Sequence, residues 1–589
     1  MIQLPTPQNG RSAGWAFRCE LVGLFLVAVA VKWWLIARVG SDLPWIDQWG
    51  PEADLYRQWL SGALRWRDFF QPANEHRIVF THLLNLGLLR LNGQWDPLLQ
   101  MAVNALLNAA GTAVLAWWIG RGLPVVTRRL VLLVVGIVMI APFGIQNIVW
   151  GFQSQIYLCL LLSCGALWLT TEWPASNWRW WAGAAVAISA YFAMSPGALV
   201  GAALLAWVAW RIMEERRISK EVLPNLLLGG LVLLMAWGLR TPIPRHDVLV
   251  APDFLRFAQV LTGVLSWPAC DPRLFLVLNA PVLVLLVGRL TGRLQATVAA
   301  DRAQLLAAWA VGVALTFSYY RGGAQDPFSA PPSRHADFFA LLPIANVLAL
   351  AQLGTVFERR KAVFLTGGAI WLVCSLVGIV SLLRDTLDNI HEHVRLRYQM
   401  GFDVLALRET GERRETLLFS VDGSIASCTA RLKDPLFQSL MPPLLQKEIA
   451  LAWPSSGALL QTAVFPPGSQ DPSPLTVWRN RNEGAVFQCG AERSEPFEVL
   501  GPAVEVLAAF TARGGKAEIV FVSEDSGSRI ALPCDSAPRG KWVKLSARLP
   551  AGRYRLEVSN RDPAGWVAFS APRKMGWLGY RVRQVLPSK

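Results

Sequence analysis

The sequence predicts an α-helical polytopic membrane protein that carries an all-β domain at its C-terminal end. Two patterns support this prediction: long apolar runs recur up to residue 383, and short alternating runs dominate after about residue 411. Of the 589 residues, 53% are hydrophobic and only 16% are charged. This composition is too apolar for an ordinary soluble enzyme of this length, so we expect most of the chain to lie in lipid.

The apolar runs predict eleven membrane spans. A hydrocarbon core of about 30 Å needs about 20 apolar residues per helix. The expected spans lie approximately at residues 19–39, 97–120, 130–150, 155–171, 179–194, 196–212, 222–240, 273–289, 303–320, 336–354 and 362–383. The first resembles a signal-peptide core, but it lacks a small-residue cleavage site and continues as an apolar run. We therefore interpret it as a retained anchor.

Residues 179–212 form either two short helices, separated at Ser195, Pro196 and Gly197, or one long tilted helix. Lys and Arg collect on the cytoplasmic side of membrane proteins. Only the split places the basic clusters near residues 121–129, 211–220, 289–302 and 359–361 on the side of the N-terminus. The split thus predicts a cytoplasmic N-terminus and places everything after Leu383 outside. A bacterial inner (plasma) membrane is the expected location, with a periplasmic or extracellular C-terminal domain.

The C-terminal region has a different pattern. We expect a transmembrane domain at residues 1–383, a helical connector at 384–410 and a β-sandwich or jelly roll at 411–589, where runs such as AEIVFVS and WVKLSARL alternate. Cys489 and Cys534 are the preferred pair for a disulfide on the oxidising side of the membrane. We attribute the net charge of +15 to the positive-inside bias of membrane proteins. No basic stripe interleaved with aromatic residues indicates binding of nucleic acid.

Three predicted outside segments, residues 40–96, 241–272 and 319–335, are long enough to carry a site. Apolar residues at helical spacing predict surface helices at 51–66, 76–91 and 253–267. The first segment opens with SDLPWIDQW, which places Asp42 and Asp47 beside Trp45 and Trp49. A carboxylate there can accept a proton from a sugar hydroxyl, and a nearby ring can stack on a sugar. The equal alternative is a set of solvated loop acids beside interfacial tryptophans.

Two further polar clusters follow on the same predicted side. The first contains Asn74, Glu75, His76 and Arg77, immediately before an apolar helix. Capping by Asn74 explains one of these residues, whereas the others suggest a polar site in which Arg77 contacts a phosphate.

The second cluster contains Arg321, Arg334 and His335, which either clamp an anionic lipid-linked phosphate or snorkel to headgroups. Polar residues near the end of the third span either line a sugar cavity or form hydrogen bonds between helices; they are Gln146, Asn147, Gln153, Ser154 and Gln155.

The motifs WIDQW, NEHRI and SRHADF, in this order and on one predicted side, resemble the GT-C class of polytopic membrane glycosyltransferases. The resemblance covers the layout of residues 1–383. SRHADF is similar to the Arg-Tyr-containing loop of several such enzymes, with His335 in place of the Tyr. The terminal domain resembles carbohydrate-binding jelly rolls, which is an analogy of fold.

The resemblance implies transfer of a hexosyl or pentosyl group from a polyprenyl-phosphate-linked donor to a glycan, lipid or protein acceptor. The donor lipid would enter laterally between spans. Asp47 would be the general base, and Asp42 its substitute or a partner that orients the acceptor or a divalent metal. Arg77 and Arg334 would stabilise the leaving phosphate, and Glu75 and His76 would orient this group. No cofactor is certain, although a divalent metal is compatible with the site.

The candidate residues fall into two groups. The candidate catalytic residues are Asp47, Asp42 and Glu75. The candidate substrate-binding residues are Trp45, Trp49, Asn74, His76, Arg77, Arg321, Arg334 and His335.

Two other functions compete with transfer. A transporter or flippase of lipid-linked saccharides predicts ionisable residues in mid-span or paired halves of similar pattern. The spans are nearly free of charge, apart from Lys32, which can snorkel, and Glu20 near a helix end. A non-enzymatic scaffold that displays the C-terminal domain leaves the acidic, Trp-rich first loop unexplained.

Overall fold

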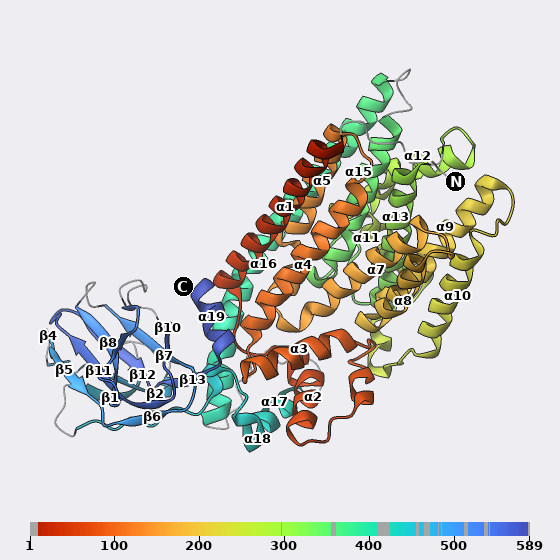
Figure 1. The fold of residues 1–589 in the computed structure, drawn as a ribbon. Helices are drawn as coiled ribbons and strands as arrows, with labels where there is room; N and C mark the ends of the chain where they lie inside the picture. The colour runs from red at the N-terminus through yellow and green to blue at the C-terminus, as the bar shows by residue number, and fades with distance from the viewer. Residues whose placement is uncertain are drawn as a thin grey trace.

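The protein is a bundle of helices followed by a β region (Figure 1). The computed structural model describes residues 10–295, 297–354, 361–409, 424–454, 459–464, 472–480, 482–483, 486–511, 516–534, 540 and 542–586. Figure 1 shows the β region at one end of the bundle, the end that also carries α2 (Pro51–Leu60) and α3 (Val79–Asn92). We call this end the loop end.

Within the described residues, nine helical segments are long and apolar enough to cross a membrane. This confirms an integral membrane architecture. The segments contain α1 (Gly10–Val39), α4 (Pro97–Gly120), α5 (Val125–Ile140) with α6 (Ile145–Ile148), α7 (Ser154–Glu172), α9 (Leu199–Glu215), α12 (Phe275–Leu290), α13 (Val298–Arg321), α14 (Ala336–Phe339) with α15 (Leu341–Gly354), and α16 (Lys361–Glu409). Two shorter helices, α8 (Trp178–Ala193) and α10 (Leu223–Gly238), have 16 residues each.

The predicted helix break near Ser195 is confirmed. The chain leaves α8 at Ala193, makes the 3₁₀ turn η5 (Ser195–Ala198) and enters α9 at Leu199. Gly197 lies so close to the end of α8 that a Cβ atom there would overlap the carbonyl of Ala190. The two helices are therefore separate elements joined by a tight turn.

Ion pairs join helix ends at the end of the bundle opposite the loop end. Arg302 at the start of α13 donates to Glu172 at the end of α7 over 2.8 Å, and Arg121 at the end of α4 lies 3.5 Å from the same carboxylate. Arg289 at the end of α12 pairs with Glu214 of α9 and Asp301 of α13 at 2.6 and 2.8 Å. A third cluster joins Glu20 of α1 to Arg128 and Arg129 of α5. We call this the basic end.

The loop end has a hydrophobic core of its own. Trp49, Tyr56 and Trp95 from the first predicted outside segment pack there with Val404 of α16 and Phe437 of α18 (Pro435–Gln438). Both amphipathic segments of that loop form helices, α2 and α3, and the third predicted surface helix is α11 (Phe254–Leu265). The last span and the predicted connector form one unbroken helix, α16, that reaches this core (Figure 1).

The β region contains two main antiparallel sheets among the described residues. One has the order β1-β2-β12-β7-β10, with β13 also paired to β7. The other has the order β5-β11-β8-β9, with β6 also paired to β11. The strands are β1 (Leu459–Val464), β2 (Pro472–Asn480), β3 (Asn482–Glu483), β4 (Val486–Phe487), β5 (Gly490–Arg493), β6 (Phe497–Val499), β7 (Ala503–Phe510), β8 (Ala517–Ser523), β9 (Arg529–Ala531), β10 (Val543–Arg548), β11 (Gly552–Asn560), β12 (Val567–Ser570) and β13 (Arg573–Met575).

The two faces of β7 explain how the β region joins the bundle. Val504, Val506 and Ala508 enter one core together with side chains from the other sheet, whereas Ala509 belongs to the core of the loop end. This two-sided burial replaces the usual alternation of buried and exposed residues.

The predicted Cys489–Cys534 disulfide is not formed, because Cys489 is exposed and Cys534 is buried in the core between the two main sheets.

Candidate functional site

A two-residue turn at the loop end presents Glu75. The backbone of Ala73 and His76 forms a pair of hydrogen bonds of 2.8 and 3.1 Å, which leaves Asn74 and Glu75 at the tip. Asn74 adopts a left-handed φ of 53°, a conformation that Asn tolerates better than most residues. The capping role considered for Asn74 is wrong, because the following helix begins only at Val79.

Residues from all three predicted outside segments meet at Glu75. Arg321, at the end of α13, donates from Nη2 to Glu75 Oε1. His246, in the 3₁₀ turn η6 (Pro244–Leu249), lies with Nδ1 3.3 Å from Glu75 Oε2. The bundle thus brings together three loops whose contacting residues lie at least 75 positions apart in sequence.

His76 connects this turn to the break between α8 and α9. Its Nδ1 lies 2.9 Å from Ser195 Oγ, and the Ser195 hydroxyl donates to the carbonyl of Glu75 over 2.8 Å. Because the hydroxyl proton is used in that bond, Ser195 accepts from His76, and we assign the proton to Nδ1. A neutral His76 therefore carries its lone pair on Nε2.

The charges around the turn shift the titration of both side chains. Burial alone would raise the pKa of Glu75, but attraction by His76 when it is protonated, by Arg321 and by His246 outweighs burial and lowers that pKa below its usual value. Burial lowers the pKa of His76; Glu75 opposes this shift, and Arg321 and His246 add to it. At neutral pH the turn consequently presents a carboxylate beside a neutral imidazole.

Arg334 lies in the 3₁₀ turn η8 (Ser333–His335), which α6 holds in place. The Arg334 amide donates to Gln146 Oε1 over 3.3 Å, and Asn147 Nδ2 donates to the Arg334 carbonyl over 2.9 Å. Asn147 also donates to Asp337 over 2.6 Å. Of the candidate sugar-lining amides, these two therefore position the arginine loop.

The Arg334 guanidinium is available for a ligand. Among the described residues it makes no hydrogen bond and no close ion pair, although the charges of Asp47 and Glu75 attract it and Arg321 repels it. The structure thus places Asp47 and Arg334 within electrostatic reach at the same end of the molecule, as the sequence predicts. His335 packs edge-on against Phe317, with ring centroids 4.9 Å apart.

Asp47 lies half-buried in the 3₁₀ turn η1 (Ile46–Trp49). The neighbouring Gln48 fixes this turn: its Oε1 accepts from the Trp45 amide over 3.1 Å, and its Nε2 donates to Glu52 and Gln100 over 3.1 and 2.9 Å. Trp45 packs against Trp150, whose indole donates to the Trp45 carbonyl over 3.1 Å.

Two predicted substrate-binding residues have structural contacts instead. Trp49 is 0% exposed in the core of the loop end and donates to the carbonyl of Pro44 over 2.9 Å, so a sugar cannot stack on it. Arg77 donates to the carbonyls of Phe70 and Leu239, at 2.5 and 3.3 Å, and thereby ties the turn to the end of α10. Its guanidinium is therefore directed at backbone oxygens.

Asp42 is drawn into contacts with the C-terminal region. Lys544 of β10 donates to both of its carboxylate oxygens over 2.6 Å, and Arg583 of α19 (Trp577–Val585) lies 3.7 Å away. Asp42 is only 3% exposed. These contacts give its burial a structural cause that the sequence does not reveal, because its partners follow some 500 residues later.

Lys32 does not snorkel to the membrane surface. It is 1% exposed, and the charge of Asp337, itself buried, attracts it across the interior of the bundle.

Asp337, His246 and Ser195 are residues of the site that the sequence does not identify as such. Ser195 and Asp337 do occur in quoted segments, as a helix break and within SRHADF, whereas His246 is marked only by its position in an outside loop.

The described residues contain no group of three or more His, Cys, Asp or Glu side chains arranged to hold a metal ion. The arrangement does suit an anionic group bound near Arg334, with a carboxylate nearby.

No protein-family model matches the sequence, and a search of curated proteins found no similar sequence.

Proposed function

We propose that this protein is a GT-C-type glycosyltransferase that moves a hexosyl or pentosyl group from a polyprenyl-phosphate donor to a glycan, lipid or protein acceptor. The observation that supports this proposal is the meeting of Asp47, Glu75, Arg321 and Arg334 at the loop end. They provide a carboxylate for a hydroxyl proton and, in Arg334, a cation that makes no hydrogen bond among the described residues and is available to a phosphate. Both groups lie at the loop end of the bundle.

The proposed topology has eleven spans. α8 and α10, with 16 residues each, complete the nine longer segments by carrying the chain from the basic end back to the loop end, so that each basic cluster falls at the basic end. The positive-inside bias then assigns the basic end, including the N-terminus, to the cytoplasm. The loop end and the β region, which we interpret as a sandwich of its two main sheets, face the periplasm or cell exterior. A bacterial inner membrane suits this arrangement.

In the proposed reaction Asp47 accepts the proton of an acceptor hydroxyl while that oxygen bonds to the anomeric carbon. The bond between the anomeric carbon and the phosphate oxygen breaks, and polyprenyl phosphate leaves with the electron pair. Arg334 stabilises the charge on the leaving phosphate, and the nearby Arg321 adds a second positive charge. Glu75 holds Arg321, and His76 holds the turn against Ser195. Asp42, Arg77 and Trp49 support the fold of the site.

One observation favours a different function. Lys32 and Asp337 are both buried inside the bundle, where their opposite charges attract each other, and intramembrane ionisable residues are typical of transport pathways. A transporter or flippase of lipid-linked saccharides is therefore the alternative proposal. It predicts that purified protein in vesicles moves the donor lipid between leaflets without consuming it, and that Lys32→Met abolishes this movement.

Asp47→Asn and Arg334→Ala test the transferase directly. In membranes supplied with a lipid-linked sugar donor, we expect each variant to lower the rate of sugar transfer by about a hundredfold or more, because each removes one group that acts in the transition state. The matched control is Arg67→Ala, which removes a 72% exposed side chain from the same outside segment and should leave the rate unchanged. Full activity in both folded variants contradicts the assigned site.

A further inference from the structure

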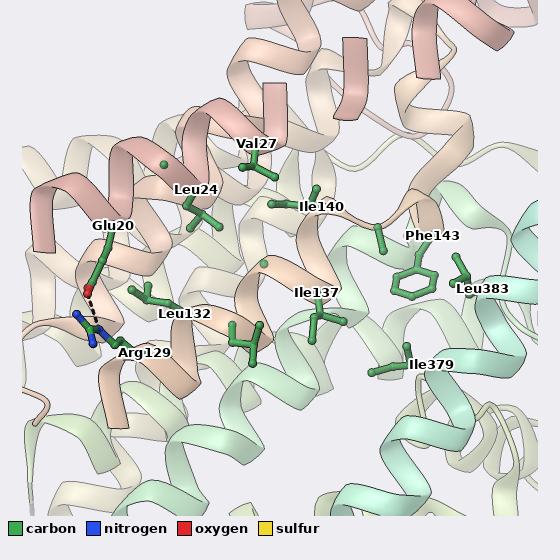
Figure 2. Close-up of a pocket in the computed structure, with 14 residues that line it drawn as sticks. Glu20, Leu24, Val27, Arg129, Leu132, Ile137, Ile140, Phe143, Ile379 and Leu383 are labelled. Carbon is green, nitrogen blue, oxygen red and sulfur yellow. Dashed lines mark hydrogen bonds and ion pairs between the residues drawn. The ribbon is translucent and has the colours of Figure 1, made fainter. Parts of the chain in front are cut away.

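A groove lies on the surface of the bundle between α1, α5 and α16 (Figure 2). Its volume is about 790 Å³. α1 contributes Gly23, Leu24 and Val27, α5 contributes residues between 132 and 140, and α16 contributes Ile379 and Leu383. Because these walls belong to segments apolar enough to cross a membrane, the groove opens toward the hydrocarbon of the bilayer.

Two glycines leave room for an occupant. A Cβ atom at Gly23 would meet nothing within 4 Å, and one at Gly136 would only touch Leu24, at an ordinary 3.5 Å. Neither glycine is therefore required by close helix packing. A larger side chain at either position would extend into the groove, which makes both positions suitable for blocking it.

The polar part of the groove lies entirely at its basic end. Glu20 and Arg129 line it there, and Figure 2 shows their ion pair, in which Arg129 Nε donates to Glu20 Oε1 over 2.8 Å. Arg128 donates to the other oxygen of the same carboxylate over 3.1 Å. One carboxylate thus faces two guanidinium groups, and the 65% exposed Arg129 side chain carries the excess positive charge to the groove mouth.

The length of the groove matches one leaflet. From Arg129 to Ile140 the chain rises by eleven residues along α5, or about 16 Å. This is about half of a hydrocarbon core of roughly 30 Å. An acyl chain that begins at the basic end would therefore end near the middle of the bilayer, beside Ile140 and Phe143.

We propose that the groove binds one anionic phospholipid of the leaflet at the basic end, with an acyl chain along α5 and the phosphate at Arg129. The charge of the groove mouth complements an anionic headgroup, and the remaining wall complements a hydrocarbon chain. The lipid would lie at the basic end of the bundle. This binding is independent of sugar transfer, whose proposed site is at the opposite end of the bundle.

Lipid retention by the purified full-length protein tests this proposal. The protein is exchanged into detergent with equimolar phosphatidylglycerol and phosphatidylethanolamine, and the lipids that remain bound are counted by native mass spectrometry. We expect one phosphatidylglycerol per chain in the wild type. Gly136→Leu, which blocks the groove, should lose it. Arg129→Ala should retain a lipid but lower the preference for phosphatidylglycerol about fivefold, and Glu20→Gln should raise that preference.

Gly230→Leu is the matched control, since Gly230 of α10 also has no atom within 4 Å of its Cβ position but lies outside the groove. It should bind phospholipid as the wild type does. If Gly136→Leu fails to fold, Gly23→Leu blocks the groove from the other wall. Equal retention by the blocked variants and the control overturns the proposal, as does retention of phosphatidylethanolamine without preference or of polyprenyl phosphate in place of phospholipid.

Discussion

Asp42 contacts two cations of the C-terminal region, Lys544 and Arg583. Substitutions of Asp42 and of Lys544 can therefore distinguish a structural role of Asp42 from a catalytic one. We expect Asp42→Asn and Lys544→Met each to lower the free energy of unfolding by about 2 kcal/mol, because each leaves a partly buried charge with a lost partner. The double variant should be hardly worse than either single one. Thermal unfolding of all three variants measures this coupling. A variant Asp42→Asn that keeps its stability but loses transfer would instead identify Asp42 as a catalytic group.

The depressed pKa of His76 predicts a pH dependence of stability. The folded protein binds a proton at His76 less readily than the unfolded chain does, whose imidazole titrates near pH 6.5. The stabilisation is therefore fully present above about pH 6.5 and is lost as the pH falls through the lower pKa of the folded state. We expect the melting temperature to fall between pH 7 and pH 5 more steeply in the wild type than in His76→Gln. Parallel curves for the two proteins contradict this assignment.

At the residue scale, the sequence predicts which residues lie on the same side of the membrane, but it does not predict their contacts. The predicted topology puts Asp47, Glu75, Arg321 and Arg334 on one side of the membrane, and the structure brings these residues together. The topology does not predict that Arg77 faces the carbonyl of Leu239, because that contact spans 162 residues and depends on how α10 ends. The burial of Trp49 likewise depends on the packed fold, so its position beside Asp47 in sequence does not reveal that it is enclosed.

At the scale of elements, the break between α8 and α9 positions Ser195 against His76. A Cβ atom at Gly197 would overlap the carbonyl of Ala190, so Gly197→Ala must move η5 away from α8. We expect this variant to lower the rate of sugar transfer at least tenfold, since small displacements of a site are costly. Gly230→Ala is the control, because its added methyl meets no neighbour. Unchanged transfer by Gly197→Ala would show that the break does not position the site.

The elements themselves were largely predictable, because their periodicity is local. Helical spacing of apolar residues indicated α2, α3 and α11, and alternation indicated the strands of the β region. Local periodicity does not reveal that β7 is buried on both faces, since its second partner is the loop end of the bundle. Nor does it show that α16 continues without a break from the bundle into that core.

At the scale of the whole molecule, the two ends of the bundle differ in how their charges are used. At the basic end, arginines pair with acidic residues of neighbouring helices, so Arg121, Arg289 and Arg302 fasten helix ends together. At the loop end, Arg334 has no such partner among the described residues. A cation without a partner is costly to keep near a membrane unless a ligand uses it, which is why we place the substrate phosphate there.

The orientation of the molecule decides whether that phosphate belongs to an extracytoplasmic donor. Lys544 and Arg583 tie the β region to Asp42 at the loop end, so the β region and the candidate site must lie on the same side of the membrane. We expect protease added to the periplasmic or external face of oriented membranes to cut within residues 411–589, and protease added to the cytoplasmic face to leave them intact. A cleavage site engineered between Arg216 and Lys220, at the basic end, is the control and should show the opposite pattern. Cleavage of the β region from the cytoplasmic face would place Asp47 and Arg334 there as well and would contradict the extracytoplasmic transferase.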